Sequence, residues 1–489
     1  MLRFWTRPLR PTLTSFSRTV TSQSTLEFNR ALYAPLSELD PVVQNIIDKE
    51  TWRQYSGLEL IASANLTSRA TMEANGSFLT NKLSEGLPNA RYYGGNDDEL
   101  EILCRERALQ AFHLDPVIWG VNVQPYSVLQ PQDRLMGLGL PDGGHLTHGY
   151  YTAKKKMTAS SIYFRSFPYA VDPGTQLIDY VGLASQVHIF KPRLIICGAS
   201  AYPRDWDYET LRKIADEHGG YLMADIAHTS GLVAAQELAD PFKYCDVTLR
   251  GPHAGLVFFR KDGEARKDLE KCVNDAVFPA CPGAFHNNTI AGIATALLQA
   301  AQPSWKAYAQ QVIKNAKALA DELLKHGYKL QTGGTDNHFV LWDLRPLKLT
   351  GSKFGDLNAV SGDSSAQVPG GSRIGTAALT SRDMQEEDLR TVANFLHRAV
   401  QLSLLVQKES GSKLLKDFVR AATVHEEGKF GAQKVAELRR EVREFARRWP
   451  LPESRDRSRG HGGLRRMIDS SEVSEATKDS TLWAGGGRK

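Results

Sequence analysis

A strand–helix–strand pattern in residues 192–228 constrains the fold more than any other part of the chain. It opens with an apolar run, "PRLIICGAS", and closes with a second one, "YLMADIAH". Between them, "DYETLRKIADEHGG" places Leu211, Ile214 and Ala215 at helical spacing. Two strands joined by one helix form a parallel, right-handed unit. Because parallel sheets are covered by helices on both faces, the sequence predicts an α/β domain.

Polar side chains follow both of these strands. Ser200 comes after the first run, and Asp225 and His228 come at the end of the second. Ligands of parallel sheets bind at the carboxyl ends of the strands, so we expect a site here. An alternative is that Asp225 only caps the turn before "IAHTSG".

The chain of 489 residues is long enough for two or three domains. After a long helix (305–327) come a strand (338–346) and two more helices (384–408 and 432–450), which predict a smaller α+β C-terminal domain. We therefore expect five parts: a leader (1–26), an N-terminal arm (27–62), a large domain (63–304), a small domain (305–450) and a disordered tail (451–489).

The first 26 residues are typical of a mitochondrial transit peptide. They carry four arginines and no acidic residue, with Leu2, Phe4 and Trp5 between basic positions. The alternative is a disordered basic tail. These arginines account for most of the net charge of +5, so the rest of the chain is near neutral and predicts no nucleic-acid partner.

Two other composition features narrow the class of protein. No apolar run approaches the ~18 residues that a membrane helix needs, so we expect no membrane span. The five cysteines have no CxxC spacing, which indicates free thiols rather than a disulfide frame or a zinc site.

A glycine-rich loop, "LPDGGHLTHG" (140–149), carries two histidines three residues apart. One interpretation is a metal site at His145 and His148, although no further ligands have suitable spacing. The other is that the glycines let the backbone approach a flat ligand on which a histidine ring stacks. Farther on, Arg373 lies in a glycine-rich turn and could clamp a carboxylate through its planar fork.

Together these stretches resemble the serine hydroxymethyltransferase family, most of all its mitochondrial form. The resemblance covers residues 30–450 and rests on "GLELIAS", "NKLSEGLPNARYYGG", "LPDGGHLTHGY", "YLMADIAHTSGLVAA", "TLRGPHAGLVFFRK" and "SRIGTAALTSR". It implies a fold-type I pyridoxal-phosphate enzyme with a large, mainly parallel sheet domain. The implied reaction interconverts serine and glycine with tetrahydrofolate and 5,10-methylenetetrahydrofolate, in the mitochondrial matrix.

The resemblance also implies a role for each site residue. For pyridoxal phosphate, Asp225 would pair with the ring nitrogen, His145 would stack on the ring beside His228, Ser200 would bond near the ring oxygen, and Gly283 would bind the phosphate. For the substrates, Ser63 and Arg373 would hold the carboxylate, with Tyr93 nearby, Glu85 as acid and base, and Leu140, Gly144 and Leu146 lining the folate site. Glu85, Tyr93 and Gly283 would come from a neighbouring subunit, which implies a homodimer or homotetramer.

The sequence departs from the family at the cofactor. In "CDVTLRGPHAGLVFFRKDG" (245–263), the Schiff-base lysine is absent, because Val247 runs directly into Thr248. Lys243 and Lys261 are the nearest lysines, and we expect neither to reach the cofactor. The phosphate-binding loop that would follow Ser127 is also missing. We expect these losses to weaken cofactor binding and to destabilise the fold.

Two main interpretations remain. In the first, the gene encodes an ordinary member of the family, and short in-frame segments are missing from this sequence. In the second, the chain is a catalytically inactive paralogue or splice form that acts as an interaction or regulatory subunit. Scattered substitutions such as Ala64 and Leu83 favour the second, since lost segments do not create point changes. A weaker third interpretation is metal-dependent hydrolysis at His145 and His148.

Overall fold

The computed structural model describes residues 32–124, 132–250, 255–262, 268–279, 284–354, 358–363, 369–412, 414–426 and 428–451. The predicted leader, Gly283, the stretch around Ser127 and the tail from residue 452 lie outside these ranges. The chain divides into two units, of which the first contains residues 32–54 and the second residues 55–451 of the described chain. In the first unit, α2 (Leu36–Leu39) leads into α3 (Pro41–Ser56).

A seven-stranded sheet forms the centre of the second unit. Its strands lie in the order β3-β11-β10-β9-β8-β4-β7. Their bounds are β3 Trp119–Asn122, β4 Arg134–Leu138, β7 Arg165–Tyr169, β8 Leu194–Gly198, β9 Tyr221–Asp225, β10 Val247–Arg250 and β11 Leu256–Arg260. Neighbouring strands are parallel from β10 to β7, whereas β11 is antiparallel to both β10 and β3. The predicted α/β, fold-type I class is confirmed.

The strand–helix–strand unit predicted for residues 192–228 forms the middle of this sheet. β8 and β9 pair in parallel, with Gly198 opposite Asp225, and α8 (Tyr208–Asp216) connects them. All five residues of β8 are buried, as expected for a strand covered on both faces. On α8, Leu211, Ile214 and Ala215 are buried on one face, which is the helical spacing that the sequence indicated. Both strands therefore deliver their carboxyl ends to the same edge.

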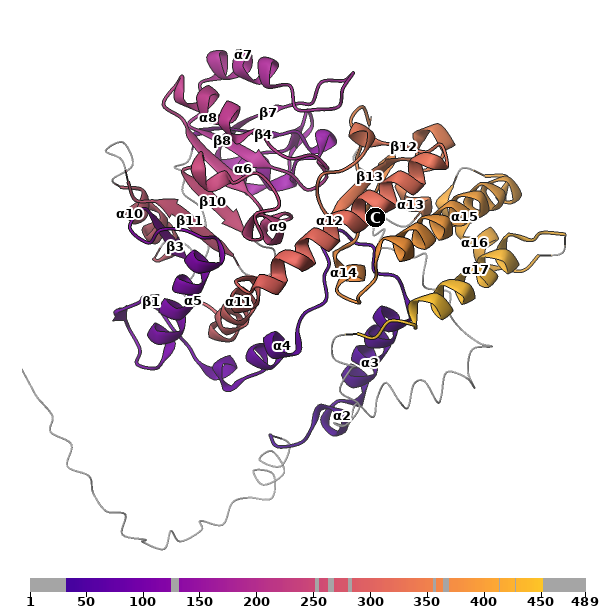
Figure 1. The fold of residues 1–489 in the computed structure, drawn as a ribbon, viewed down its shortest axis with the longest axis horizontal. Coiled ribbons are helices and arrows are strands. Elements are labelled where there is room, and N and C mark those ends of the chain that lie inside the picture. The colour runs from indigo at the N-terminus through magenta and orange to yellow at the C-terminus, as the bar shows by residue number, and fades with distance from the viewer. Residues whose placement is uncertain are drawn as a thin grey trace, which may run out of the picture. The chain divides into compact units, whose positions relative to one another are not determined.

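Helices surround the sheet and connect it to a second layer of structure (Figure 1). They are α4 Arg69–Asn75, α5 Asp97–Ala111, α6 Ala159–Tyr163, α7 Tyr180–Phe190, α9 Ser230–Ala234, α10 Leu269–Val277 and α11 Asn287–Ala300. The long helix α12 (Pro303–Lys325) runs from this part to the C-terminal part of the unit. Its buried residues, among them Ala309 and Val312 near one end and Leu323 at the other, contact both parts.

The C-terminal part combines a small antiparallel sheet with helices. β12 (Lys329–Leu330), β13 (Phe339–Asp343) and β14 (Gly371–Gly375) form the sheet. Around it lie α13 Gly351–Phe354, α14 Ala377–Thr380, α15 Glu386–Ser410, α16 Leu415–Thr423 and α17 Gly431–Ala446. The N–H of Gly375 donates to the carbonyl of Leu60 at 2.8 Å, so the chain just before Ser63 is bonded to this sheet.

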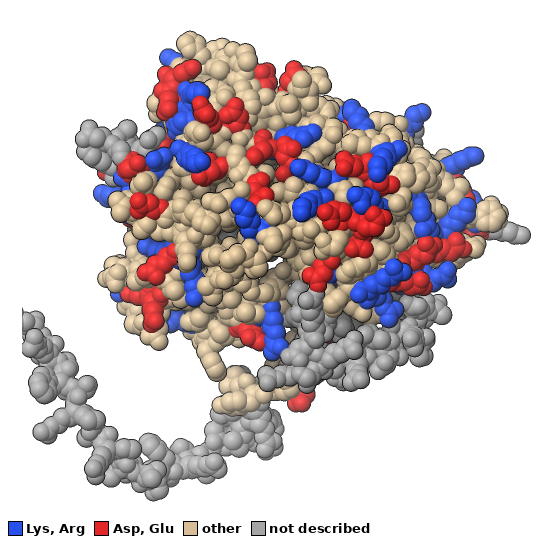
Figure 2. Space-filling model, viewed as in Figure 1, with Lys and Arg blue, Asp and Glu red and all other residues tan. Residues whose placement is uncertain are grey.

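The surface carries charges of both signs. On the face in Figure 2, lysine and arginine side chains are interspersed with aspartate and glutamate, with no continuous basic patch. Within the described ranges, no helix combines the length and the apolar character needed to cross a membrane.

Candidate functional site

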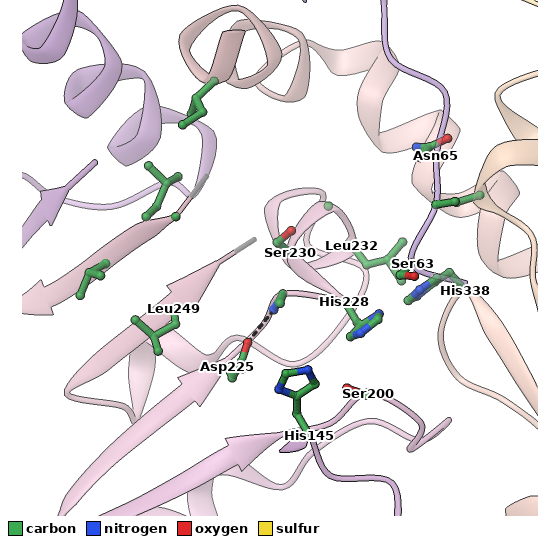
Figure 3. A pocket seen from close by; sticks show the side chains of 18 of the residues that line it. Ser63, Asn65, His145, Ser200, Asp225, His228, Ser230, Leu232, Leu249 and His338 are labelled. Carbon is green, nitrogen blue, oxygen red and sulfur yellow. Dashed lines mark hydrogen bonds between the residues drawn. The ribbon is translucent and has the colours of Figure 1, made fainter. Parts of the chain in front are cut away.

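A cavity of about 910 Å³ opens at the carboxyl ends of β8, β9 and β10 (Figure 3). Ser63, His145, Ser200, Asp225 and His228 all line it. α12 adds the aromatic side chains of Trp305 and Tyr308 to its wall. The sequence placed a ligand site at this edge of the sheet, and five of the residues singled out for it come together there.

Asp225 is held in the cavity by two hydrogen bonds. His148 Nε2 donates to Asp225 Oδ2 at 2.9 Å, and the N–H of Ala227 donates to Asp225 Oδ1 at 3.0 Å. Burial by itself would raise the pKa of the Asp225 carboxyl, but the bond from His148 and the Ala227 N–H outweigh it and leave the pKa below its ordinary value. Asp225 therefore presents a carboxylate, which suits a protonated ring nitrogen.

The contact of His148 with Asp225 was not predicted from the sequence. His148 ends the 3₁₀ turn Leu146–His148, where it is buried, and its Nδ1 accepts the N–H of His145 at 3.4 Å. With Nδ1 as acceptor, Nε2 carries the proton that goes to Asp225. Both nitrogens are thus engaged, which leaves the alternative of a metal site at His145 and His148 without support. Among the described side chains, no group of three or more His, Cys, Asp or Glu could hold a metal ion.

The His145 imidazole faces the cavity from the glycine-rich loop. Gly143 turns this loop with a φ of 104°, and Gly144 passes so close to Leu138 that an added Cβ would lie 1.8 Å from the carbonyl oxygen. His145 Nδ1 lies 2.7 Å from Thr147 Oγ1. Burial, and then the neighbouring His148, lower the pKa of His145, so its ring is neutral at pH 7 and suited to stacking.

A second pair of imidazoles, His228 and His338, lies across the cavity. Their rings are stacked, with centroids 6.3 Å apart and an interplanar angle of 14°. His338 Nε2 bonds to the carbonyl of Ala62 at 3.0 Å. Burial lowers the pKa of His228 to about 4 and that of His338 to about 3. His338 begins the strand segment 338–346 in the sequence, where nothing distinguished it from a core residue.

Arg373 lies on β14 beside the cavity. Its guanidinium donates to the carbonyl of Ser200 and lies over the ring of Phe339, 6.0 Å from the centroid. Burial is the main cause of the lowered pKa of His228, and the positive charge of Arg373 lowers this pKa further. The N–H of Ser200 in turn donates to Gly143 at 2.8 Å, which connects the arginine to the glycine-rich loop.

Other predicted site residues lie apart from this cavity. Glu85 precedes β1 (Gly86–Leu87) and Tyr93 follows β2 (Ala90–Arg91), and neither lines it. Leu140, Gly144 and Leu146 belong to the glycine-rich loop but are not in the cavity wall, although Leu146 is exposed. Gly283, predicted to bind the phosphate, lies outside the described ranges.

β10 has no lysine at the cavity. Val247 and Thr248 lie inside this strand and are paired with both β9 and β11, so the strand runs through the join in the sequence. Among the described side chains of β10, Leu249 lines the cavity. Lys243 is exposed in the 3₁₀ turn Pro241–Lys243, and Lys261 Nζ donates to the carbonyl of Pro116.

The residues present thus fit pyridoxal phosphate, the cofactor implied by the resemblance, only in part. The carboxylate of Asp225 suits its ring nitrogen, and the neutral imidazole of His145 suits its ring face. Among the described residues that line the cavity, no lysine is available to hold it covalently.

Comparison with known proteins gives one consistent match. A family model described as serine hydroxymethyltransferase matches residues 36–396. Serine hydroxymethyltransferase 4 of Arabidopsis thaliana is 51% identical over 457 residues, which cover 85% of this chain and 95% of that protein. The cytosolic serine hydroxymethyltransferase of Oryctolagus cuniculus is 47% identical over 461 residues, 86% and 95% of the two chains. The serine hydroxymethyltransferase of Caenorhabditis elegans is 47% identical over 455 residues, 85% and 89%.

Proposed function

Because the chain belongs to the serine hydroxymethyltransferase family, whose members interconvert serine and glycine with tetrahydrofolate, we propose that its cavity is the site of that reaction. The observation that carries the proposal is the bonded group His148–Asp225, which lines one cavity together with His145 and Ser200, while Arg373 lies beside the cavity and donates to the carbonyl of Ser200. The half-buried carboxylate of Asp225 suits a protonated ring nitrogen, and the planar guanidinium of Arg373 suits the carboxylate of an amino acid.

Each residue has a role in binding rather than in a covalent step. Arg373, with Ser63, binds the substrate carboxylate. Asp225 keeps the proton on a ring nitrogen, and His145 stacks on the ring. Pyridoxal phosphate, when bound, supplies an electron sink. The exposed side chain of Leu146, in the same loop as the half-buried Leu140 and the buried Gly144, offers a surface for tetrahydrofolate beside the cavity.

The assay measures glycine formed from serine with tetrahydrofolate and added pyridoxal phosphate. We expect slow turnover that Asp225→Asn abolishes and that Asp321→Asn, an exposed position on α12, leaves unchanged. Turnover equal in Asp225→Asn and the unaltered chain would contradict the proposal.

The missing lysine favours a second candidate function. Without a covalent attachment point, the chain could serve as a non-catalytic subunit that combines with active members of the family. This candidate predicts no glycine formation alone, together with a changed activity of an active family member after co-expression. A further alternative is that the gene encodes a segment that is missing from this sequence. Sequencing the transcript across codons 240–255 tests this alternative.

We also propose that the protein is a homodimer or homotetramer. Glu85 and Tyr93 lie away from the cavity of their own chain, and Tyr93 is exposed, which suits a role in the cavity of a partner subunit. Light scattering coupled to gel filtration measures the mass. A monomer of 54.2 kDa would rule the arrangement out.

For the location, we propose the mitochondrial matrix, on the basis of the acid-free, arginine-rich residues 1–26. A fusion of residues 1–30 to a fluorescent protein tests this, and a diffuse cytosolic signal would argue against it.

A further inference from the structure

Leu249 stands on the strand next to Asp225. β10 runs parallel to β9, and Leu249 is the register partner of Asp225. The N–H of Ile226 donates to the carbonyl of Leu249 at 3.0 Å, which fixes the two strand ends together. Thr248, its neighbour in β10, is fully buried. Of the β10 side chains that the structure describes, a leucine is therefore the one that contributes to the cavity wall.

Leu249 belongs to a larger apolar surface, here called the apolar end. It consists of Val123, Leu249, Leu256, Val257, Ile290 and Ile293, which come from β10, β11, α11 and the residue that follows β3. In Figure 3, Leu249 lies on one side of Asp225 and the labelled histidines lie on the other. The cavity thus has a polar end for hydrogen bonding and stacking, and an apolar end beyond Asp225.

The charges of the wall are unbalanced. Asp225 is the one carboxylate among the described lining residues, and these include no lysine or arginine. The guanidinium of Arg373 lies beside the polar end, where it donates to the carbonyl of Ser200, so it is not a residue of the apolar end. The stretches 125–131, 251–254 and 280–283, which adjoin lining residues in the sequence, contain no lysine or arginine, whereas the side chain of Arg250, which follows Leu249, lies outside the described part of the structure. A phosphate ester carries roughly −1.5 to −2 charges at pH 7. Burying such a group against apolar side chains and beside a carboxylate is unfavourable.

We propose that this cavity prefers an unphosphorylated pyridine-type ring over the phosphate ester of the same ring. The protonated ring nitrogen donates to Asp225, His145 stacks on the ring, and an uncharged substituent faces the apolar end. This inference rests on the ring site of the proposed function, and it names Leu249 as the residue that sets the preference.

Pyridoxine and pyridoxine 5′-phosphate are suitable probes, because neither has an aldehyde that reacts with surface lysines. Titration calorimetry with the full chain gives both dissociation constants. We expect pyridoxine to bind about tenfold more tightly than its phosphate ester, because the phosphate loses hydration without gaining a cation. Tighter binding of the phosphate ester to the unaltered chain would overturn the inference.

Leu249→Lys supplies a cation to the apolar end and should reverse the preference. With pyridoxal phosphate and borohydride, mass spectrometry should then find an adduct at position 249. Leu298→Lys, at an exposed position of α11, is the matched control and should keep the original preference. A preference unchanged in a folded Leu249→Lys chain counts against the role of Leu249. If Leu249→Lys does not fold, the ratio of the two dissociation constants of the unaltered chain decides whether the inference holds.

The outcomes also separate this inference from the proposed function. If the phosphate ester binds more tightly and Asp225→Asn abolishes that binding, the ring site stands and only the preference fails. If neither probe binds, the ring site and the preference fail together.

Discussion

His148 Nε2 donates to Asp225 Oδ2 across 2.9 Å, although the two residues are 77 positions apart in the chain. The bond joins the glycine-rich loop to the end of β9 and fixes the carboxylate toward the cavity. It also opposes the effect of burial on the pKa of Asp225. His148 is thus a positioning residue, acting on a ligand through Asp225.

His148→Ala should weaken the binding of pyridoxine by about 10–100-fold at pH 7, because Asp225 loses a charge-assisted bond worth roughly 1.5–3 kcal/mol. The pKa of Asp225 should also rise, since burial then acts with less opposition. Binding titrations from pH 5 to 8 would show a steeper loss at the acid end in the variant. A purely structural role would lower affinity equally at every pH.

Gly144→Ala should disrupt the glycine-rich loop. The added Cβ would lie 1.8 Å from the carbonyl oxygen of Leu138, a backbone atom that cannot move aside. We expect a loss of about 3 kcal/mol in stability and the displacement of His145. Urea unfolding measures the first effect, and pyridoxine binding the second.

Gly76→Ala is the control for this variant, because its added Cβ would meet Met72 at an ordinary 3.5 Å. It should change stability by less than about 0.5 kcal/mol. Equal stability of the two variants would refute the close approach at Gly144.

Stability should fall in mild acid because of His338. Its pKa is about 3 in the folded chain, where burial and His228 disfavour the charged form, against about 6.5 when unfolded. Between these values the unfolded state binds more protons, so stability is full above pH 6.5 and falls as the pH decreases toward 3. At pH 5 the loss from His338 amounts to about 2 kcal/mol.

Urea midpoints at pH 7 and pH 5 measure this loss. His338→Gln should reduce the difference between the two midpoints, whereas His425→Gln, at an exposed position, should not. If the midpoint of the unaltered chain does not change with pH, the neutral, buried state of His338 is wrong.

Local patterns predicted some parts of this molecule well. The apolar runs around α8 gave β8 and β9, and the polar residues after those strands placed Ser200, Asp225 and His228 at one edge. A strand's end is a local property, so sequence can locate it.

What local patterns did not predict are pairings between distant segments. The bond of His148 to Asp225 and the stacking of His338 on His228 join different elements, and no spacing within either segment encodes them. At the join of Val247 and Thr248, β10 is paired on both sides, because the residues after the join continue the strand and bring Leu249 opposite Asp225. That the missing segment destabilises the fold stays a prediction.

Substitutions of Trp342 show how much side-chain packing in the C-terminal part contributes to stability. Trp342 is fully buried on β13, 4.5 Å from the ring of Tyr328 and 5.2 Å from that of Phe354. Its Nε1–H has no hydrogen-bond partner among the described residues. Trp342→Ala should cost about 3–5 kcal/mol, because it leaves a cavity between these rings. Trp342→Phe should cost less than about 1.5 kcal/mol, because it keeps an aromatic ring and removes an unpaired donor. Urea unfolding, monitored by circular dichroism, measures the free energy of unfolding of both variants. An equal loss in the two variants would mean that the indole N–H of Trp342 has a partner that the phenyl ring cannot replace.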